Sequence, residues 1–188
     1  MDLKPEILTH PNIPKPLHGL NPRAIKGQTW WDVTRQEVYK TTDYHCAACG
    51  VHKTQAKGNK KWLEAHEYYD IDYENGIAIV KDIVPLCNYC HKFIHSGFLY
   101  VEVQKGHMSK NEAITILERG FKILRENNLK AFYGTIDIAD RLGANTTGIK
   151  SYTPTDSGVV WSDWRLMFDG KKHKPLFNNY EEWKYNYN

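Results

Sequence analysis

Two alternating segments on either side of a tight turn dominate the hydrophobic pattern of the chain. From Trp62 to Val84, aromatic and β-branched residues alternate with polar ones around Tyr73-Glu74-Asn75-Gly76. Asn-Gly tolerates positive φ angles at both positions and is a strong hairpin signal, and β-branched residues suit strands. The pattern therefore predicts a β-hairpin over residues 62–84.

Helical periodicity is clearest after residue 108. Ser109 and Glu112 have the spacing of a capping box, and the apolar positions up to about Asn127 fall mostly on one broad face. The spacing predicts a helix that packs across the core, followed by a short helix over 136–142. A further helix is expected over about 30–41 with Thr29 as its N-cap, and residues 98–103 suggest a short strand.

The two ends of the chain have no regular period. Five prolines within residues 1–27 disfavour a regular helix or central strand, so we expect an irregular but ordered arm, with Arg23 available to phosphate. Residues 143–158 are rich in turn-forming residues and predict a loop. The tail from residue 159 is dense in Trp, Tyr and Phe. It either covers the core or offers a stacking surface for bases or a docking surface for a protein partner.

All four cysteines lie in two Cys-x-x-Cys pairs, Cys46 with Cys49 and Cys87 with Cys90. Four thiolates brought together by a fold form a closed tetrahedral site for Zn²⁺. The alternatives are two disulfides or buried thiols. The N-terminus has no hydrophobic leader, so we expect neither a signal peptide nor an oxidising compartment. Paired Cys-x-x-Cys motifs in a cytosolic chain favour metal binding, and the sequence predicts a structural zinc.

Three histidines remain near these pairs. His91 directly follows Cys90, and His91 and His95 are i, i+4 neighbours on one face of the helix expected there, with Gly97 as its stop. His66 lies in the first strand of the hairpin. A surface histidine pair and a core histidine are the alternatives, but three imidazoles around two knuckles favour a second metal site.

The two cysteine pairs, the hairpin and the closing segment 82–97 together resemble the HNH endonuclease family, whose knuckled version is widespread in bacterial and phage enzymes. The resemblance covers about residues 44–97. It implies an α+β fold with a small ββα-metal core and two zinc knuckles, flanked by helices, an N-terminal arm and an aromatic C-terminal tail. The expected division is an arm and helix over 1–43, the nuclease core over 44–100, a helical extension over 101–150 and the tail over 151–188.

The resemblance implies a metal-dependent DNA endonuclease or nickase that hydrolyses phosphodiester bonds. His66, His91 and His95 would then hold a catalytic divalent metal. Zn²⁺, Ni²⁺ or Mn²⁺ suits imidazole ligands better than Mg²⁺ does, because Mg²⁺ prefers oxygen. DNA is the expected partner.

Two positions depart from the family pattern. The family's general base is a histidine directly after the first metal-binding histidine, where this chain has Glu67, and the family's middle asparagine falls at Asp82. A glutamate has a usual pKa near 4.3 and is a weaker base than imidazole near neutral pH. In an alternative alignment with the family motif, His66 is the base and Glu64 or Glu67 helps to hold the metal. The departures also leave open a non-cutting HNH-like zinc-binding module that binds nucleic acid or a protein partner.

Charge and composition add little to this picture. The chain has 25 Lys and Arg against 22 Asp and Glu, a net charge of +3, which is weak evidence for a polyanionic partner. The most basic stretch follows the first knuckle, and beside a nuclease site we expect its lysines to contact phosphates: Lys53, Lys57, Lys60 and Lys61. No apolar run approaches the roughly 20 residues of a membrane span, so a soluble protein in the cytoplasm of a bacterial or phage-infected cell is expected.

Overall fold

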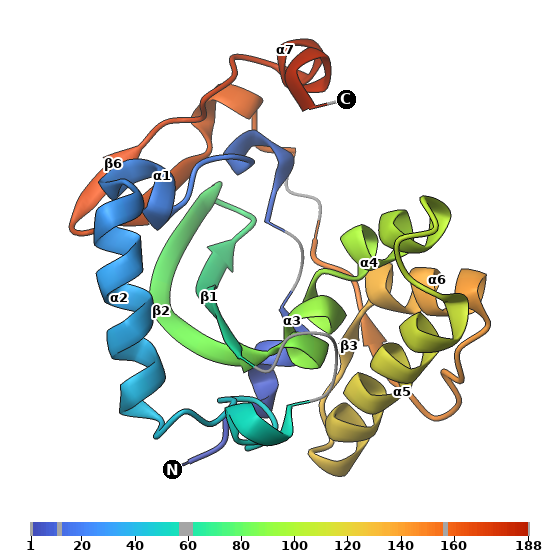
Figure 1. Ribbon diagram of the computed structural model, residues 1–188. Coiled ribbons are helices and arrows are strands. Elements are labelled where there is room, and N and C mark those ends of the chain that lie inside the picture. The colour runs from blue at the N-terminus through green and yellow to red at the C-terminus, as the bar shows by residue number, and fades with distance from the viewer. Residues whose placement is uncertain (1, 11–12, 57–61, 156–157, 188) are drawn as a thin grey trace. The chain divides into compact units, whose positions relative to one another are not determined.

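The chain folds as an α+β protein with helices and a four-stranded mixed sheet (Figure 1). The computed structural model describes residues 2–10, 13–56, 62–155 and 158–187. These residues form two compact units, each built from three separate stretches of chain. Unit 1 comprises Met1–Asn12, Val38–His66 and Val84–Thr153, and unit 2 comprises Ile13–Glu37, Glu67–Ile83 and Pro154–Asn188. The four expected segments are contiguous, whereas both units are discontinuous.

Unit 1 contains most of the helices and the parts of the hairpin farthest from its turn. Its elements are η1 (Pro5–Thr9), η3 (Lys53–Gln55), the start of β1 (Leu63–Asp72), the end of β2 (Ile77–Cys87), α3 (Asn88–Ile94), α4 (Ser96–Gln104), α5 (Lys110–Glu126), β3 (Ala131–Phe132), α6 (Tyr133–Leu142) and β4 (Ser151–Tyr152). Helices α3 to α6 gather into one group in Figure 1.

The core of unit 1 lies between α3 and α5. Phe93 of α3 and Phe121 of α5 are fully buried and meet edge to face, with ring centroids 5.3 Å apart, an arrangement that aromatic pairs favour. Gly120 provides the room for this contact, because a Cβ atom there would lie 2.1 Å from Cδ2 of Phe93. The apolar face of α5 therefore holds in place α3, which carries His91 and is followed by His95.

The helices predicted from periodicity in unit 1 are confirmed. Helix α5 begins after Ser109, whose Oγ accepts a hydrogen bond from the Glu112 backbone N–H at 3.1 Å, as a capping box requires. Helix α6 covers the expected 136–142 and starts three residues earlier, at Tyr133.

Two expectations around residue 97 were wrong. Residues 98–103 form part of α4 rather than a strand, and Gly97 lies inside that helix rather than ending α3. Helix α3 ends at Ile94, and His95 joins the two helices with φ −90° and ψ 43°. The β-branched residues favour a strand locally, but Leu99 is 1% exposed on the face of α4 that packs against α5 and α6. Tertiary packing therefore overrides the local preference.

Unit 2 is built around the sheet. Its elements are η2 (Lys15–Leu17), α1 (Pro22–Lys26), most of α2 (Gln28–Thr41), the hairpin ends of β1 and β2, η4 (Trp161–Asp163), β5 (Arg165–Phe168), β6 (Lys171–His173) and α7 (Tyr180–Tyr187). The strand order is β1-β2-β5-β6. The predicted hairpin is confirmed, and Gly76 in its turn has φ +66°. Strand β5 joins β2 in parallel, with Ala78 opposite Leu166, and β6 joins β5 antiparallel.

The N-terminal arm is more regular than its prolines suggest. Pro22 begins α1, and Asn21 caps that helix through a hydrogen bond from the Ala24 backbone N–H to Oδ1 at 2.8 Å. Proline is favoured at the first position of a helix, where its missing N–H has no partner to lose. The prediction of irregular structure was therefore wrong for this segment. Helix α2 also begins at Gln28, before the expected Thr29 cap.

Part of the aromatic tail packs in the core of unit 2. Trp164 and Leu166 are buried together with Leu17, Leu20 and Ala78. A second group of aromatic rings joins Trp161, Tyr180 and Trp183, with ring centroids 5.5–6.5 Å apart. By contrast, Val33 of α2 is 55% exposed. No helix among the described residues combines the length and apolar character that crossing a membrane requires.

Candidate metal centres

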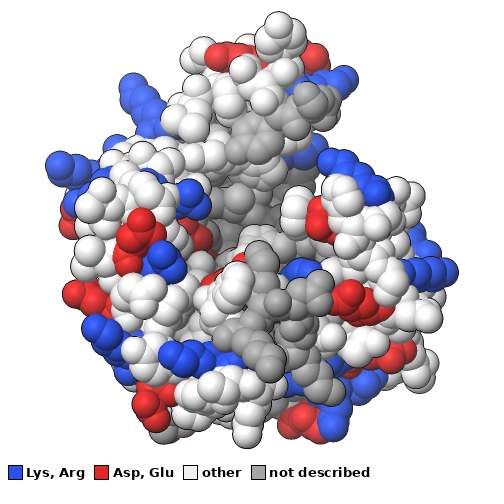
Figure 2. All heavy atoms as spheres, viewed as in Figure 1, with Lys and Arg blue, Asp and Glu red and all other residues white. Residues whose placement is uncertain are grey.

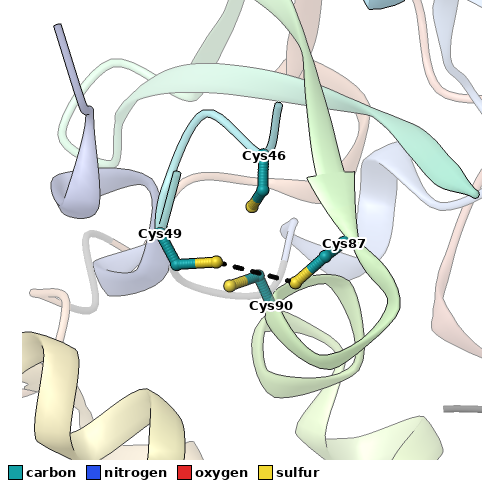
Figure 3. A group of neighbouring side chains, drawn as sticks. All are labelled: Cys46, Cys49, Cys87 and Cys90. Atoms are coloured by element: carbon teal, nitrogen blue, oxygen red, sulfur yellow. Dashed lines mark hydrogen bonds between the residues drawn. The ribbon is translucent and has the colours of Figure 1, made fainter. Parts of the chain in front are cut away.

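The four cysteine side chains of unit 1 point toward a common centre (Figure 3). They are free thiols, and their Sγ atoms all lie within 4.8 Å of one another. The Sγ atoms of Cys49 and Cys87 are 3.8 Å apart. A regular tetrahedron with metal–sulfur bonds of about 2.3 Å has sulfur–sulfur edges of about 3.8 Å. The cysteines are therefore close enough to hold one metal ion. We call this group the cysteine centre.

Local backbone geometry positions both cysteine pairs. Cys46 receives a hydrogen bond at its carbonyl oxygen from Gly50 N–H at 2.8 Å, and Gly50 has φ +71°, which favours glycine. The Ala47 N–H donates to the Pro85 carbonyl oxygen at 2.8 Å, which ties the first turn to β2. Cys87 is the N-cap of α3 and Cys90 lies in its first turn. The hairpin end and the helix start thus bring the two pairs together.

The four thiols of the cysteine centre differ in how readily they ionise. The neighbouring thiols, followed by burial, raise the pKa of Cys90 well above its usual range. In the opposite direction, hydrogen bonds from the neighbouring thiols lower the pKa of Cys49. Four thiolates cannot share this buried space without a positive charge between them. One such charge is already close, because Arg119 Nη2 of α5 donates to Cys49 Sγ at 3.7 Å.

Three imidazoles of unit 1 form a second candidate site. One ring nitrogen from each of His66, His91 and His95 lies within 4.8 Å of the other two. The ring centroids are 4.6–5.4 Å apart. His66 comes from β1, His91 from α3, and His95 from the residue that caps α3, whose N–H donates to the His91 carbonyl oxygen at 3.1 Å. The structure therefore brings the three predicted histidines together. We call this group the histidine centre.

The histidine centre has the properties of a ligand set. His66 is 5% exposed, and its Nε2 has no hydrogen-bond partner among the described residues. A buried polar atom without a partner costs free energy unless a ligand satisfies it. Burial, aided by the charges of the neighbouring histidines, lowers the pKa of His66 well below its usual value and that of His95 to about 4. Neutral imidazole is the form that binds metals.

Glu64 orients one of these rings. Its Oε2 lies 3.2 Å from Nδ1 of His91, and its Oε1 accepts a hydrogen bond from Asn88 Nδ2 at 2.8 Å. A proton on Nδ1, facing this carboxylate, would leave the Nε2 lone pair of His91 available to a metal. A carboxylate behind a metal-binding histidine is a recurrent arrangement that fixes the tautomer and ring orientation. Glu64 thus supports a ligand rather than joining the ligand set.

The sequence analysis missed a fourth histidine, His10. It caps the end of η1, is 7% exposed, and its ring centroid lies 6.2 Å from that of His66. No motif or spacing signalled it, because 55 residues separate it in sequence from His66. Only the packing of η1 against α3 and α5 brings it here.

The positions expected to supply the base lie outside the set of converging nitrogens. Glu67 follows His66 on β1 and is half-buried. Successive side chains of a strand point to opposite faces, so Glu67 and His66 diverge locally. Asp82 is exposed, and its Oδ1 accepts a hydrogen bond from the Ile83 backbone N–H at 2.8 Å. Their catalytic roles remain predictions.

The expected DNA-contacting residues are only partly described. Lys57, Lys60 and Lys61 lie outside the described residues. Lys53 is in η3, and its Nζ lies 3.5 Å from the ring centroid of Tyr44, a cation–π contact. Arg23 is exposed on α1 in unit 2. On the face shown in Figure 2, basic and acidic side chains of the described residues are interspersed.

Comparisons with known proteins returned no match: no family model, no curated protein and no solved structure matches this chain. The assignment of function therefore depends on the chemistry of the two centres.

Proposed function

We propose that this chain is an HNH-type, metal-dependent DNA endonuclease or nickase with a ββα-metal core. The observation that carries the proposal is the convergence of His66, His91 and His95 within 4.8 Å. These histidines come from a strand and a helix joined through the second strand of a hairpin, the order that the family resemblance implies. The cysteine centre beside them in the sequence supports the same assignment.

The cysteine centre is proposed to hold a structural Zn²⁺. Four sulfur ligands with tetrahedral edges suit Zn²⁺, and such closed sites contribute to folding rather than to chemistry. The centre joins the turn at Cys46 and Cys49 to the end of β2 and the first turn of α3, so a bound zinc would stabilise the helix that carries His91. Binding free energy at such a site is also folding free energy.

The histidine centre is proposed to hold the catalytic metal. Three imidazoles suit Zn²⁺, Ni²⁺ or Mn²⁺, and three protein ligands leave positions for water and substrate. When bound, the metal would neutralise the scissile phosphate and stabilise the leaving 3′ oxygen. The Glu64 carboxylate, 3.2 Å from Nδ1 of His91, favours the tautomer that presents Nε2. The pairing of Glu64 with His91 favours the alignment with the family motif in which His66 is a metal ligand. In that alignment Glu67 is the proposed base, which takes a proton from the attacking water.

Nicking of supercoiled plasmid with Mg²⁺, Mn²⁺, Ni²⁺ or Zn²⁺ tests the proposal. We expect metal-dependent cutting that is abolished in His91→Ala and strongly reduced in Glu67→Ala. His107→Ala and Glu74→Ala are matched controls, because both side chains are exposed and neither belongs to a centre. Zinc content is measured on each variant, with one zinc per chain expected at the cysteine centre.

Absence of cutting with every metal, in protein that retains its zinc and its fold, would contradict the nuclease function. The scaffold would then be better explained as a non-cutting module that binds nucleic acid or a protein partner. Full activity in Glu67→Ala together with loss in His91→Ala would keep the nuclease and exclude Glu67 as the base.

A further inference from the structure

His10 lies next to the histidine centre but is not one of its three residues. Its ring meets that of His66 edge-on, with an interplanar angle of 86° and a centroid separation of 6.2 Å. The three rings of the centre are closer to one another, at 4.6–5.4 Å. His10 is also absent from the set of ring nitrogens that lie within 4.8 Å of one another. Its position is therefore beside the ligand set.

The fold fixes this position firmly within unit 1. Ile7 and Leu8 of the same segment are buried at 0% and 2% exposure. The Lys4 N–H donates to the Ala47 carbonyl oxygen at 2.8 Å, beside the first cysteine pair. At the other end, the Tyr152 hydroxyl donates to the Thr9 carbonyl oxygen. Contacts on both sides thus anchor the segment that ends in His10.

The position of His10 suits contact with an anion bound at the histidine centre. His10 is 7% exposed, and its ring lies beside that of the candidate ligand His66. The imidazoles carry no negative charge to offset a divalent cation, and the Glu64 carboxylate behind His91 supplies one. A phosphate group bound there would add further negative charge and would accept a hydrogen bond from a ring N–H.

We propose that His10 is a substrate-contacting residue, which donates an N–H hydrogen bond to a non-bridging phosphate oxygen of a phosphodiester bound at the histidine centre. The inference rests on the proposed function for its substrate class. It extends the proposed site, which the family resemblance places within residues 44–97, to the N-terminal segment that ends in His10.

Inorganic phosphate binding to the metal-loaded chain provides a test that does not depend on cleavage. A hydrogen bond to a charged group is worth enough for its loss to weaken binding about 10- to 100-fold. We expect that loss in His10→Ala and in His10→Phe, which keeps a ring but no donor. His10→Gln retains an N–H donor and is expected to recover part of the affinity. Metal affinity at the histidine centre should stay within about twofold of wild type, since His10 is not a ligand.

Plasmid nicking is measured on the same variants, with His107→Ala as the control. Wild-type phosphate affinity in His10→Phe would overturn the inference. A loss of metal affinity equal to that of His95→Ala would also overturn it, because His10 would then be a fourth ligand. If the wild-type chain cuts no DNA but His10→Phe still loses phosphate affinity, the nuclease proposal fails while the contact of His10 with phosphate stands.

Discussion

Oε2 of Glu64 on β1 and Nδ1 of His91 on α3 lie 3.2 Å apart, close enough for the carboxylate to favour the tautomer with its proton on Nδ1. Asn88 holds the other oxygen of the same carboxylate at 2.8 Å. In that tautomer Nε2 of His91 is the nitrogen available to a metal. The contact between Glu64 and His91 therefore links β1 to α3 through a candidate metal ligand as well as through packing.

Replacing this carboxylate should weaken metal binding. Glu64→Gln keeps the shape of the side chain and removes its charge, and loss of such a partner typically lowers metal affinity about 10- to 100-fold. Competition titration with a metal indicator measures the effect at the histidine centre. Glu126→Gln, on the exposed end of α5, is the control and should be neutral. Equal affinities for Glu64→Gln and wild type would show that Glu64 does not tune His91.

Arg119 should slow the release of metal from the cysteine centre. Its Nη2 donates to Cys49 Sγ at 3.7 Å, and a tetrathiolate site carries excess negative charge that a guanidinium offsets. We expect Arg119→Gln to release zinc to a chelator up to about tenfold faster, and Arg119→Lys to restore part of the difference. Arg141→Gln, at an exposed helical ion pair, should release zinc at the wild-type rate. Unchanged release in Arg119→Gln would contradict this role.

Gly120→Ala should destabilise unit 1. The new Cβ would lie 2.1 Å from Cδ2 of the buried Phe93, and overpacking of this kind costs on the order of 1–3 kcal/mol. Gly97→Ala is a matched control, since Gly97 is also helical and a Cβ there has nothing within 4 Å. Alanine is the better helix former by about 1 kcal/mol, so this control should be neutral or stabilising. Urea unfolding of both variants measures the difference, and equal midpoints would count against the packing argument.

His18 should make stability depend on pH. Burial lowers its pKa below the usual 6.5, although a hydrogen bond with the Ile13 carbonyl oxygen at 3.0 Å partly opposes the shift. The folded state therefore binds the proton less tightly than the unfolded chain. The contribution of neutral His18 is complete above about pH 6.5 and is lost as the pH falls toward the folded pKa.

The measurement compares the free energy of unfolding of wild type and His18→Gln at about pH 7.5 and about pH 5.5. The wild type should lose more stability on acidification than the variant, because the other titrating groups are common to both. Parallel losses would show that His18 does not titrate differently in the two states.

Local patterns in the sequence predicted the elements that depend on neighbouring residues. The Asn-Gly turn, the capping box at Ser109 and the apolar face of α5 are local signals, and the hairpin and helix follow from them. The cysteine spacing likewise predicted the cysteine centre, because a two-residue gap places both thiols of a pair on one side of a turn. The i, i+4 spacing of His91 and His95 predicted two of the three converging imidazoles.

Tertiary structure decided the features that depend on contacts between distant segments. The β-branched residues of 98–103 suit a strand locally, and burial of Leu99 against α5 and α6 makes them a helix. Strand β5 joins β2 although the paired residues are 88 positions apart in the sequence, with Arg165 opposite Ile77 and Met167 opposite Ile79. His10 and Arg119 meet the two centres only through the packing of η1 and α5. No spacing in the sequence encodes such contacts, because they arise from which apolar faces bury one another.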